Sequence, residues 1–145
     1  MIEELLVERD WAVGLIGLDL LDEQLYPLLY EHLDERALFR NAGAYSLLAR
    51  HFNDWYRNHR KWLNALIKSW TGDPRHGEGN RKVLGDIVDH WFPPAREAVQ
   101  TFAAGLAEQA GSVSVVGAAE RGVAELAASL TRVGIPVPAS QGASS

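Results

Sequence analysis

The stretch from Ala44 to Trp70 constrains the fold of this chain more than any other segment, because its apolar residues recur every three or four positions almost without a break. This spacing is typical of one face of a helix. The apolar positions are Ala44, Leu47, Leu48, Phe52, Trp55, Tyr56, Trp62, Leu63, Leu66, Ile67 and Trp70, and the opposite face carries Arg50, Asp54, Arg57, Lys61, Asn64 and Lys68. At about 1.5 Å per residue such a helix is roughly 40 Å long. A helix of this length and pattern predicts packing against other long helices.

The segments before it also have helical spacing. A helix is predicted from Ile2 to about Gln24, and Pro27 should bend or end it because proline cannot continue the backbone hydrogen bonding. The residues from Leu33 to Gly43 are rich in turn formers and predict a break before the long helix.

The second half of the chain predicts shorter helices separated by breaks. Thr71 to Asn80 has the composition of a loop, and Asn80 suits the N-cap of the next helix. Pro93-Pro94 is expected to interrupt that helix, with the second proline in the first turn of a new one. Gly111 to Val116 is compatible with a short strand or a linker, and Ala118 to Arg132 is again helical in pattern.

These segments predict an all-α fold, a bundle of long amphipathic helices. We expect a helical bundle over residues 1–110, a linker and short C-terminal helix over 111–134, and a disordered tail over 135–145, where proline, glycine, serine and alanine dominate. The length of 145 residues is typical of a single core.

Composition excludes several classes of function. The net charge of −5, spread over both signs, argues against nucleic acid or an anionic membrane as partner. The chain has no cysteine, which excludes disulfides, thiolate metal sites and cysteine nucleophiles. The N-terminus is acidic where a signal peptide would be basic, and the apolar stretch from Trp11 to Leu21 is too short to span a bilayer. We therefore expect a cytoplasmic protein.

A helical bundle invites a test for a carboxylate-bridged di-iron site, which requires Glu-x-x-His pairs on facing helices. The residues three positions before the five histidines are Leu29, Leu48, Tyr56, Asp73 and Ile87. No Glu-x-x-His pair is therefore present. Asp73 and His76 have the right offset but lie in the predicted loop, where helical geometry cannot aim both side chains at one ion. We predict no catalytic, cofactor-binding or metal-binding residue in this chain.

Some polar residues fall on packing faces. Asp19, His51 and His59 are placed there by the periodicity, and a hydrogen bond to a neighbouring side chain is favoured over metal binding. Asp86 and His90 are spaced for a helical pair, and pairing is favoured over a metal clamp.

Two further patterns are weak. Gly77 to Asn80 precedes a helix but lacks the strand and the Lys-Ser/Thr ending of a phosphate-binding loop. The basic residues Arg57, His59, Arg60 and Lys61 alternate with aromatic ones, and we interpret them as a solvated helix face.

Five tryptophans leave two interpretations open. Trp11, Trp55, Trp62, Trp70 and Trp91 either form the private core of this domain or contact another chain. Tryptophan is common in both settings, because it buries a large area and is enriched at the centres of interfaces.

Several strings resemble the β (small) subunits of soluble di-iron monooxygenase hydroxylases, which act on toluene, phenol, alkenes or propane. The resemblance extends over roughly Glu4 to Leu106. The strings are Glu8-Arg9-Asp10-Trp11 followed by Asp19, Phe52-Asn53-Asp54-Trp55, Arg60-Lys61-Trp62-Leu63 near Lys68, and Asp73-Pro74-Arg75-His76-Gly77-Glu78-Gly79-Asn80-Arg81-Lys82-Val83-Leu84 followed by Trp91, Pro93 and Ala95.

The resemblance implies a partial ferritin-like bundle that matches the C-terminal part of such a subunit. In that family the β subunit has lost the iron ligands and serves as a scaffold at the centre of the hydroxylase dimer. Asp54 and Arg57 stand where the iron-bearing α subunit would carry a ligand pair, and they cannot hold iron together. The resemblance thus implies a non-catalytic structural subunit of a complex that oxidises small hydrocarbons or aromatics.

The same resemblance implies partners. They are a hydroxylase α subunit that carries the di-iron centre, self-association, and indirectly a reductase and an effector protein. Two alternatives remain: a stand-alone helical interaction or oligomerisation protein, and an independent metalloenzyme that uses Asp19, Glu23, His51 and Asp54.

Overall fold

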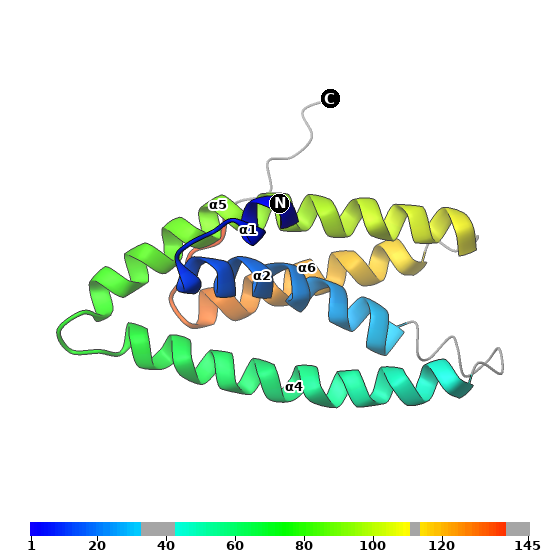
Figure 1. Ribbon diagram of the computed structural model, residues 1–145, viewed down its shortest axis with the longest axis horizontal. Coiled ribbons are helices and arrows are strands. Elements are labelled where there is room, and N and C mark those ends of the chain that lie inside the picture. Colours follow the sequence, from blue (N-terminus) through cyan, green and yellow to red (C-terminus); the bar gives the residue numbers. More distant parts are fainter. Residues whose placement is uncertain (33–42, 111–113, 139–145) are drawn as a thin grey trace, which may run out of the picture.

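The computed structural model describes residues 1–32, 43–110 and 114–138, and every regular element within these ranges is a helix (Figure 1). The elements in chain order are α1 (Ile2–Leu6), α2 (Trp11–Tyr26), the π-helix η1 (Pro27–His32), α4 (Gly43–Thr71), α5 (Gly77–Ala110) and α6 (Ser114–Arg132). The predicted all-α fold of long helices is confirmed.

The first predicted helix is divided in two. The chain leaves the helix after Leu6 and starts again at Trp11, because Asp10 is extended (φ −83°, ψ 110°) and caps α2. Its Oδ1 accepts hydrogen bonds from the backbone N–H groups of Ala12 and Val13, at 2.9 and 3.4 Å. An N-cap of this kind satisfies donors that a continuous helix would satisfy itself. The predicted single helix from Ile2 to Gln24 is therefore wrong.

Pro27 ends the α-helical hydrogen bonding of α2, as expected, and the chain continues as η1. The turn predicted from Leu33 to Gly43 lies outside the described residues except for Gly43, which is already the first residue of α4.

The long central helix is confirmed as α4, with 29 residues. Its predicted apolar face, however, is split by the structure. One side of α4 is buried and includes Ala49, Tyr56, Leu63 and Ile67. Leu66 and Trp70 of the predicted packing face are half-buried against the core. Much of the remainder is exposed, and this part includes Leu47, Leu48, Phe52, Trp55 and Trp62.

A tight turn joins α4 to α5. Asp73 Oδ1 accepts hydrogen bonds from the backbone N–H groups of Arg75 and His76, at 2.8 and 2.7 Å. Gly77 is required at the start of α5, because a Cβ there would lie 2.5 Å from the carbonyl oxygen of Thr71. The helix thus begins before Asn80, and the predicted N-cap is wrong. Asn80 Nδ2 instead donates to the Trp70 carbonyl oxygen at 2.9 Å.

The prolines predicted to interrupt the next helix lie inside α5, which runs unbroken from Gly77 to Ala110. Figure 1 shows that α5 changes direction about midway along its length. Proline has the backbone φ of a helix but cannot donate to the carbonyl four residues earlier, so it bends a helix that packing holds together. Pro93 and Pro94 leave the carbonyls of Asp89 and His90 without that donor, and both of these residues are exposed to water.

The structure also corrects the predicted bounds of the C-terminal helix and of the disordered tail. Ser114, inside the segment read as a strand or a linker, already starts α6, and residues 111–113 lie outside the described part. Ile135, where the disordered tail was predicted to start, is 1% exposed and belongs to the core. A turn with Gly134 at φ 81° brings Ile135 back against the bundle. Residues 139–145 lie outside the described residues.

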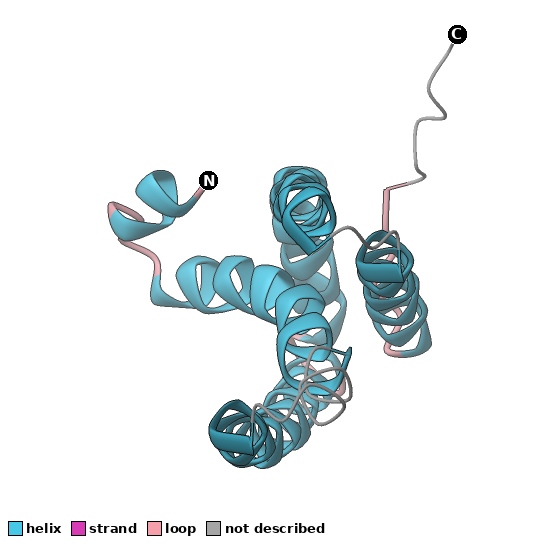
Figure 2. Cartoon of the chain, turned by 90° about the vertical axis from the view of Figure 1, so that its right-hand side faces the viewer, coloured by secondary structure: helices cyan, strands magenta, loops and turns pink. Residues whose placement is uncertain are grey.

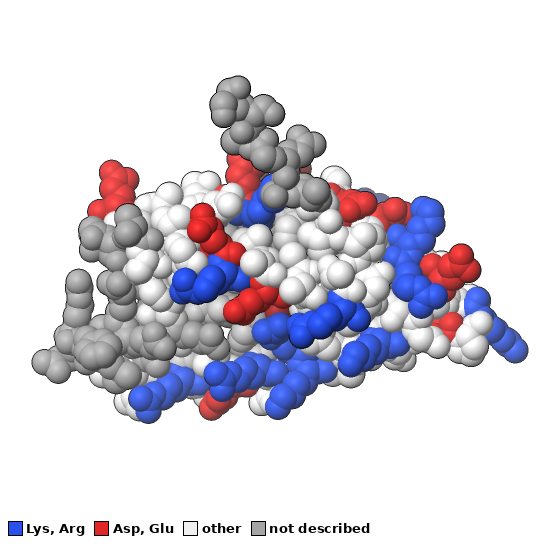
Figure 3. Space-filling view, turned by 180° about the vertical axis from the view of Figure 1, so that it is seen from behind, with Lys and Arg blue, Asp and Glu red and all other residues white. Residues whose placement is uncertain are grey.

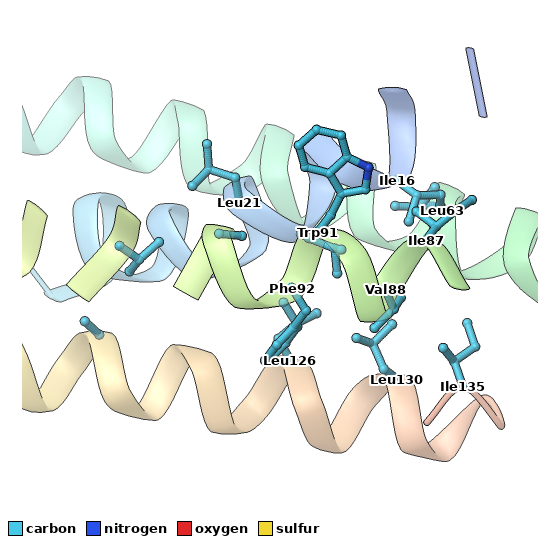
Figure 4. Close-up of a cluster of buried hydrophobic side chains, with 14 of the residues drawn as sticks. Ile16, Leu21, Leu63, Ile87, Val88, Trp91, Phe92, Leu126, Leu130 and Ile135 are labelled. Atoms are coloured by element: carbon cyan, nitrogen blue, oxygen red, sulfur yellow. The ribbon is translucent and has the colours of Figure 1, made fainter. Parts of the chain in front are cut away.

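Figure 2 shows the helices end on, and most core residues come from α2, α5 and α6. Leu63 and Ile67 of α4 and Leu28 of η1 complete the core. Figure 4 shows Trp91 and Phe92 of α5 between Ile16 and Leu21 on α2 and Leu126 and Leu130 on α6. The backbone of α4 approaches η1 and α5, but it stays away from the backbone of α2, and long side chains fill the space between them. None of the described helices combines the length and the apolar character needed to cross a bilayer.

Candidate functional site

Six polar side chains meet in the space between α2 and α4. Asp19, Asp22 and Glu23 come from α2, and Tyr56, His59 and Arg60 come from α4. We refer to these six as the polar cluster. On each helix the spacing of three or four residues places the side chains on one side, which faces the other helix.

Glu23 is the most completely satisfied member. Its Oε2 lies 2.8 Å from Arg60 Nε and accepts a hydrogen bond from the Tyr56 hydroxyl at 3.1 Å. The Glu23 side chain is 7% exposed and that of Arg60 is 30% exposed. The Arg60 guanidinium also lies 5.6 Å from the centre of the Tyr56 ring, within cation–π range. These three side chains join α2 to α4 in the absence of close backbone packing.

The other two carboxylates, those of Asp19 and Asp22, are not paired with Arg60. Asp19 Oδ1 lies 3.2 Å from His59 Nε2. Asp22 is half-buried and forms no ion pair with any described residue. The cluster therefore contains three carboxylates but only one permanent cation, Arg60.

Burial shifts the proton affinity of the cluster. Burial, together with the smaller effect of the nearby Asp19 charge, raises the pKa of Glu23 to about 7 and that of Asp22 to about 6. The pKa of Asp19 is also raised by burial, against the opposing effect of His59. The hydrogen bond to Asp19 raises the pKa of His59. At neutral pH the folded cluster therefore holds protons that the unfolded chain would release.

The stability of the protein is expected to fall as pH rises from about 5 to 8. The pKa values of Glu23 and Asp22 are higher in the folded chain than in the unfolded one, so unfolding releases protons and becomes easier at higher pH. The raised pKa of His59 acts in the same direction, since its stabilising charge is lost as pH rises. Urea unfolding at a series of pH values measures this slope.

The control for the pH dependence is a pair of variants. Glu23→Gln should flatten the slope, whereas Asp86→Asn, which changes an exposed carboxylate paired with Lys82, should leave it unchanged. A stability that increases over this range would contradict the expected role of the cluster.

The donor set of the cluster does not fit an iron centre. The guanidinium of Arg60 lies 2.8 Å from Glu23 Oε2, so a metal ion bound to this carboxylate would lie next to a second cation that repels it. In the described part of the chain, no three His, Cys, Asp or Glu side chains converge so that they could hold a metal ion. We therefore derive no chemistry through iron from these residues.

The structure separates the residues of the metalloenzyme hypothesis. Asp19 and Glu23 belong to the polar cluster, but His51 and Asp54 are exposed on another side of α4. The four residues are not brought together. His51 was predicted on the packing face, which is wrong, and its ring contacts Phe52. His59 does hydrogen-bond to a neighbouring side chain, as predicted.

The remaining candidates have local roles. Asp86 pairs with Lys82 at 3.0 Å rather than with His90, whose ring lies against Trp91 at 4.8 Å. Gly77 to Asn80 form the first turn of α5. Arg60, interpreted as part of a solvated face, turns inward to Glu23.

The tryptophans divide between the two interpretations. Trp91 is a core residue with 4% of its surface exposed, whereas Trp55 and Trp62 are 50% and 53% exposed. Trp11 and Trp70 pack edge to face at 5.8 Å and line an apolar groove of about 300 Å³ with residues of α5.

The fold and the cluster together define a class of protein: an all-α bundle whose antiparallel helices α2 and α4 are joined by ion-paired side chains. The chain belongs to the Methane/Phenol/Alkene Hydroxylase family, whose sequence model matches residues 1–74. All six residues of the polar cluster lie in the matched part.

One curated relative is phenol 2-monooxygenase, oxygenase component DmpL, from Pseudomonas sp. (strain CF600). It is 28% identical over 116 residues, which cover 79% of this chain and 33% of the relative. The chain therefore spans about a third of the length of that relative. No solved structure matches the chain.

Proposed function

We propose that this chain is a non-catalytic structural subunit, or part of one, in a di-iron monooxygenase hydroxylase complex. The complex acts on small hydrocarbons or aromatics, and the di-iron centre lies on a partner α subunit. In this proposal the chain corresponds to the C-terminal part of a hydroxylase β subunit and works in the cytoplasm. A reductase and an effector protein act on the complex rather than on this chain.

The observation that carries the proposal is the ion pair between Glu23 and Arg60. A buried carboxylate between two long helices is a common ligand position in di-iron bundles. Here the carboxylate is neutralised by a guanidinium and a tyrosine hydroxyl, which contribute structure rather than metal binding. Family membership and the match to an oxygenase component supply the context of a complex.

The test is co-expression with a hydroxylase α subunit encoded beside this chain. We expect the two chains to purify together, the iron to be found on the α subunit, and hydroxylase activity to fall when this chain is omitted. The purified chain alone should contain only substoichiometric iron by metal analysis. Stoichiometric iron on this chain alone, or an α subunit that is fully active and never associates with it, would refute the proposal.

A further inference from the structure

Five aromatic side chains lie along α2, η1 and α4; Phe52, Trp55 and Trp62 are exposed, and Tyr26 and Tyr30 are half-buried. The ring centre of Tyr26 lies 5.2, 5.8 and 5.2 Å from those of Tyr30, Trp55 and Tyr56. The ring of Tyr30 stacks on that of Phe52, with 5.3 Å between the ring centres. Trp55 stacks on His59 at 5.4 Å, and His59 lies 5.8 Å from Trp62. We define the aromatic face as Tyr26, Tyr30, Phe52, Trp55 and Trp62.

The aromatic face is an unusual feature for a protein surface. Phe52, Trp55 and Trp62 are 41%, 50% and 53% exposed, and they follow each other along one side of α4. Leu48 and Leu18 are also exposed, and helical spacing places Leu48 on the same side of α4 as Phe52 and Leu18 on the same side of α2 as Asp22 and Tyr26. Single exposed apolar residues are ordinary, but a contiguous set of this kind marks an interaction site. The face extends over about three helical turns of α4, roughly 15 Å, which is a suitable length for a helical partner.

Asp22 gives this surface a charge. It lies on α2 one turn before Tyr26 and one turn after Leu18. Its charge raises the pKa of both Tyr26 and His59, which shows that it lies near both side chains. Its carboxylate has no ion pair among the described residues, because Arg60 is bound to Glu23 and His59 to Asp19. A half-buried carboxylate without an ion pair among the described residues therefore lies beside the aromatic face.

The basic residues of α4 do not provide that cation. Helical spacing places Arg50, Arg57, Lys61 and Lys68 along a different side of α4 from Phe52, Trp55 and Trp62. Figure 3 shows basic side chains in a row along the edge formed by α4 when the molecule is seen from behind.

We propose that the aromatic face binds an amphipathic helix of another protein chain, which inserts apolar side chains between the rings and presents a lysine or arginine to Asp22. Packing against tryptophan and tyrosine supplies most of the affinity. The cation pairs with Asp22 and lies against the neighbouring rings, which attract positive charge. This pairing selects a helix with a basic residue at its centre over one with an acidic residue.

This inference goes beyond the proposed function, because it describes a binding surface whether or not its partner is a hydroxylase. Nucleic acids and anionic lipids are disfavoured as occupants, since both would bring phosphate to Asp22. A second copy of this chain is disfavoured too, since it would bring another aromatic face with its own Asp22 carboxylate rather than a cation.

The probes for the test are two synthetic amphipathic helical peptides that contain no tryptophan. They are identical except at one central position next to the apolar face of the peptide, which is lysine in one peptide and glutamate in the other. Binding is followed by the fluorescence of the protein's tryptophans and by calorimetry. We expect the lysine peptide to bind about tenfold more tightly than the glutamate peptide. Asp22→Asn should abolish this preference, and Trp55→Ala should weaken the binding of both peptides.

Asp89→Asn, which changes an exposed carboxylate on α5, is the matched control and should retain the preference. Circular dichroism shows whether each variant is folded, and Asp22→Asn breaks no ion pair within the described part of the chain. Equal affinity for the two peptides, no binding of either peptide, or a preference that survives Asp22→Asn would overturn the proposal. It would also be overturned by stable self-association that Trp55→Ala abolishes, or by tighter binding to phosphatidylserine vesicles or single-stranded oligonucleotides.

Discussion

Replacing Arg60 by leucine is expected to lower the free energy of unfolding by about 3 kcal/mol, because Glu23 is left buried without its cation. Removing one partner of a fully buried pair typically costs about 3–5 kcal/mol, and the partial exposure of Arg60 places the expected cost at the lower end. Glu23 can escape part of the penalty by binding a proton. The loss should therefore be larger at pH 8 than at pH 6, as measured by urea unfolding.

The matched control for Arg60→Leu is Lys61→Met, which changes the next basic residue on the exposed side of α4 and should alter stability by less than about 0.5 kcal/mol. The double variant Arg60→Leu with Glu23→Leu removes both charges and should be more stable than Arg60→Leu alone. Equal stability of Arg60→Leu and the wild type would show that the ion pair does not hold α2 against α4.

Replacing Phe92 by alanine is expected to cost about 3–5 kcal/mol, since the ring is 2% exposed and fills the core between α2, α5 and α6. Figure 4 shows Phe92 directed at Leu126 on α6. A domain of this size has a total stability of about 5–15 kcal/mol, so the variant should unfold at much lower urea concentration.

Phe102→Ala removes the same side chain from a site on the same helix where the ring is 42% exposed. Its expected cost is below about 1 kcal/mol, since little buried surface is lost. Comparison of the two unfolding midpoints separates the effect of the core from that of helix propensity, and equal losses would contradict the assignment of Phe92 to the core.

Periodicity alone was sufficient to predict α4 and the all-α fold. It failed where a single residue decides the local structure. Asp10 breaks a run of helical spacing, because its side chain satisfies the first N–H groups of α2. Pro93 and Pro94 fail to break a helix, because tertiary packing holds their neighbours Trp91, Phe92 and Ala95 in the core.

The polar cluster was predictable only in part. Asp19 and His59 were recognised from their positions on packing faces, and their hydrogen bond agrees with that interpretation. Tyr56 and Arg60 were missed because their partner Glu23 lies more than thirty residues away in the sequence, and spacing within one helix carries no information about it. One signal was present: α2 has three carboxylates and no basic residue, so their cations must come from another helix.

The prolines of α5 have a consequence for the shape of the whole bundle. A straight helix of 34 residues would be about 50 Å long and could follow the direction of only one neighbour. With the bend, α5 becomes two arms, the first leaving the turn after α4 and the second leading towards the start of α6 (Figure 1). The angle between these arms therefore contributes to how α4, which precedes the first arm, is oriented relative to α6, which follows the second.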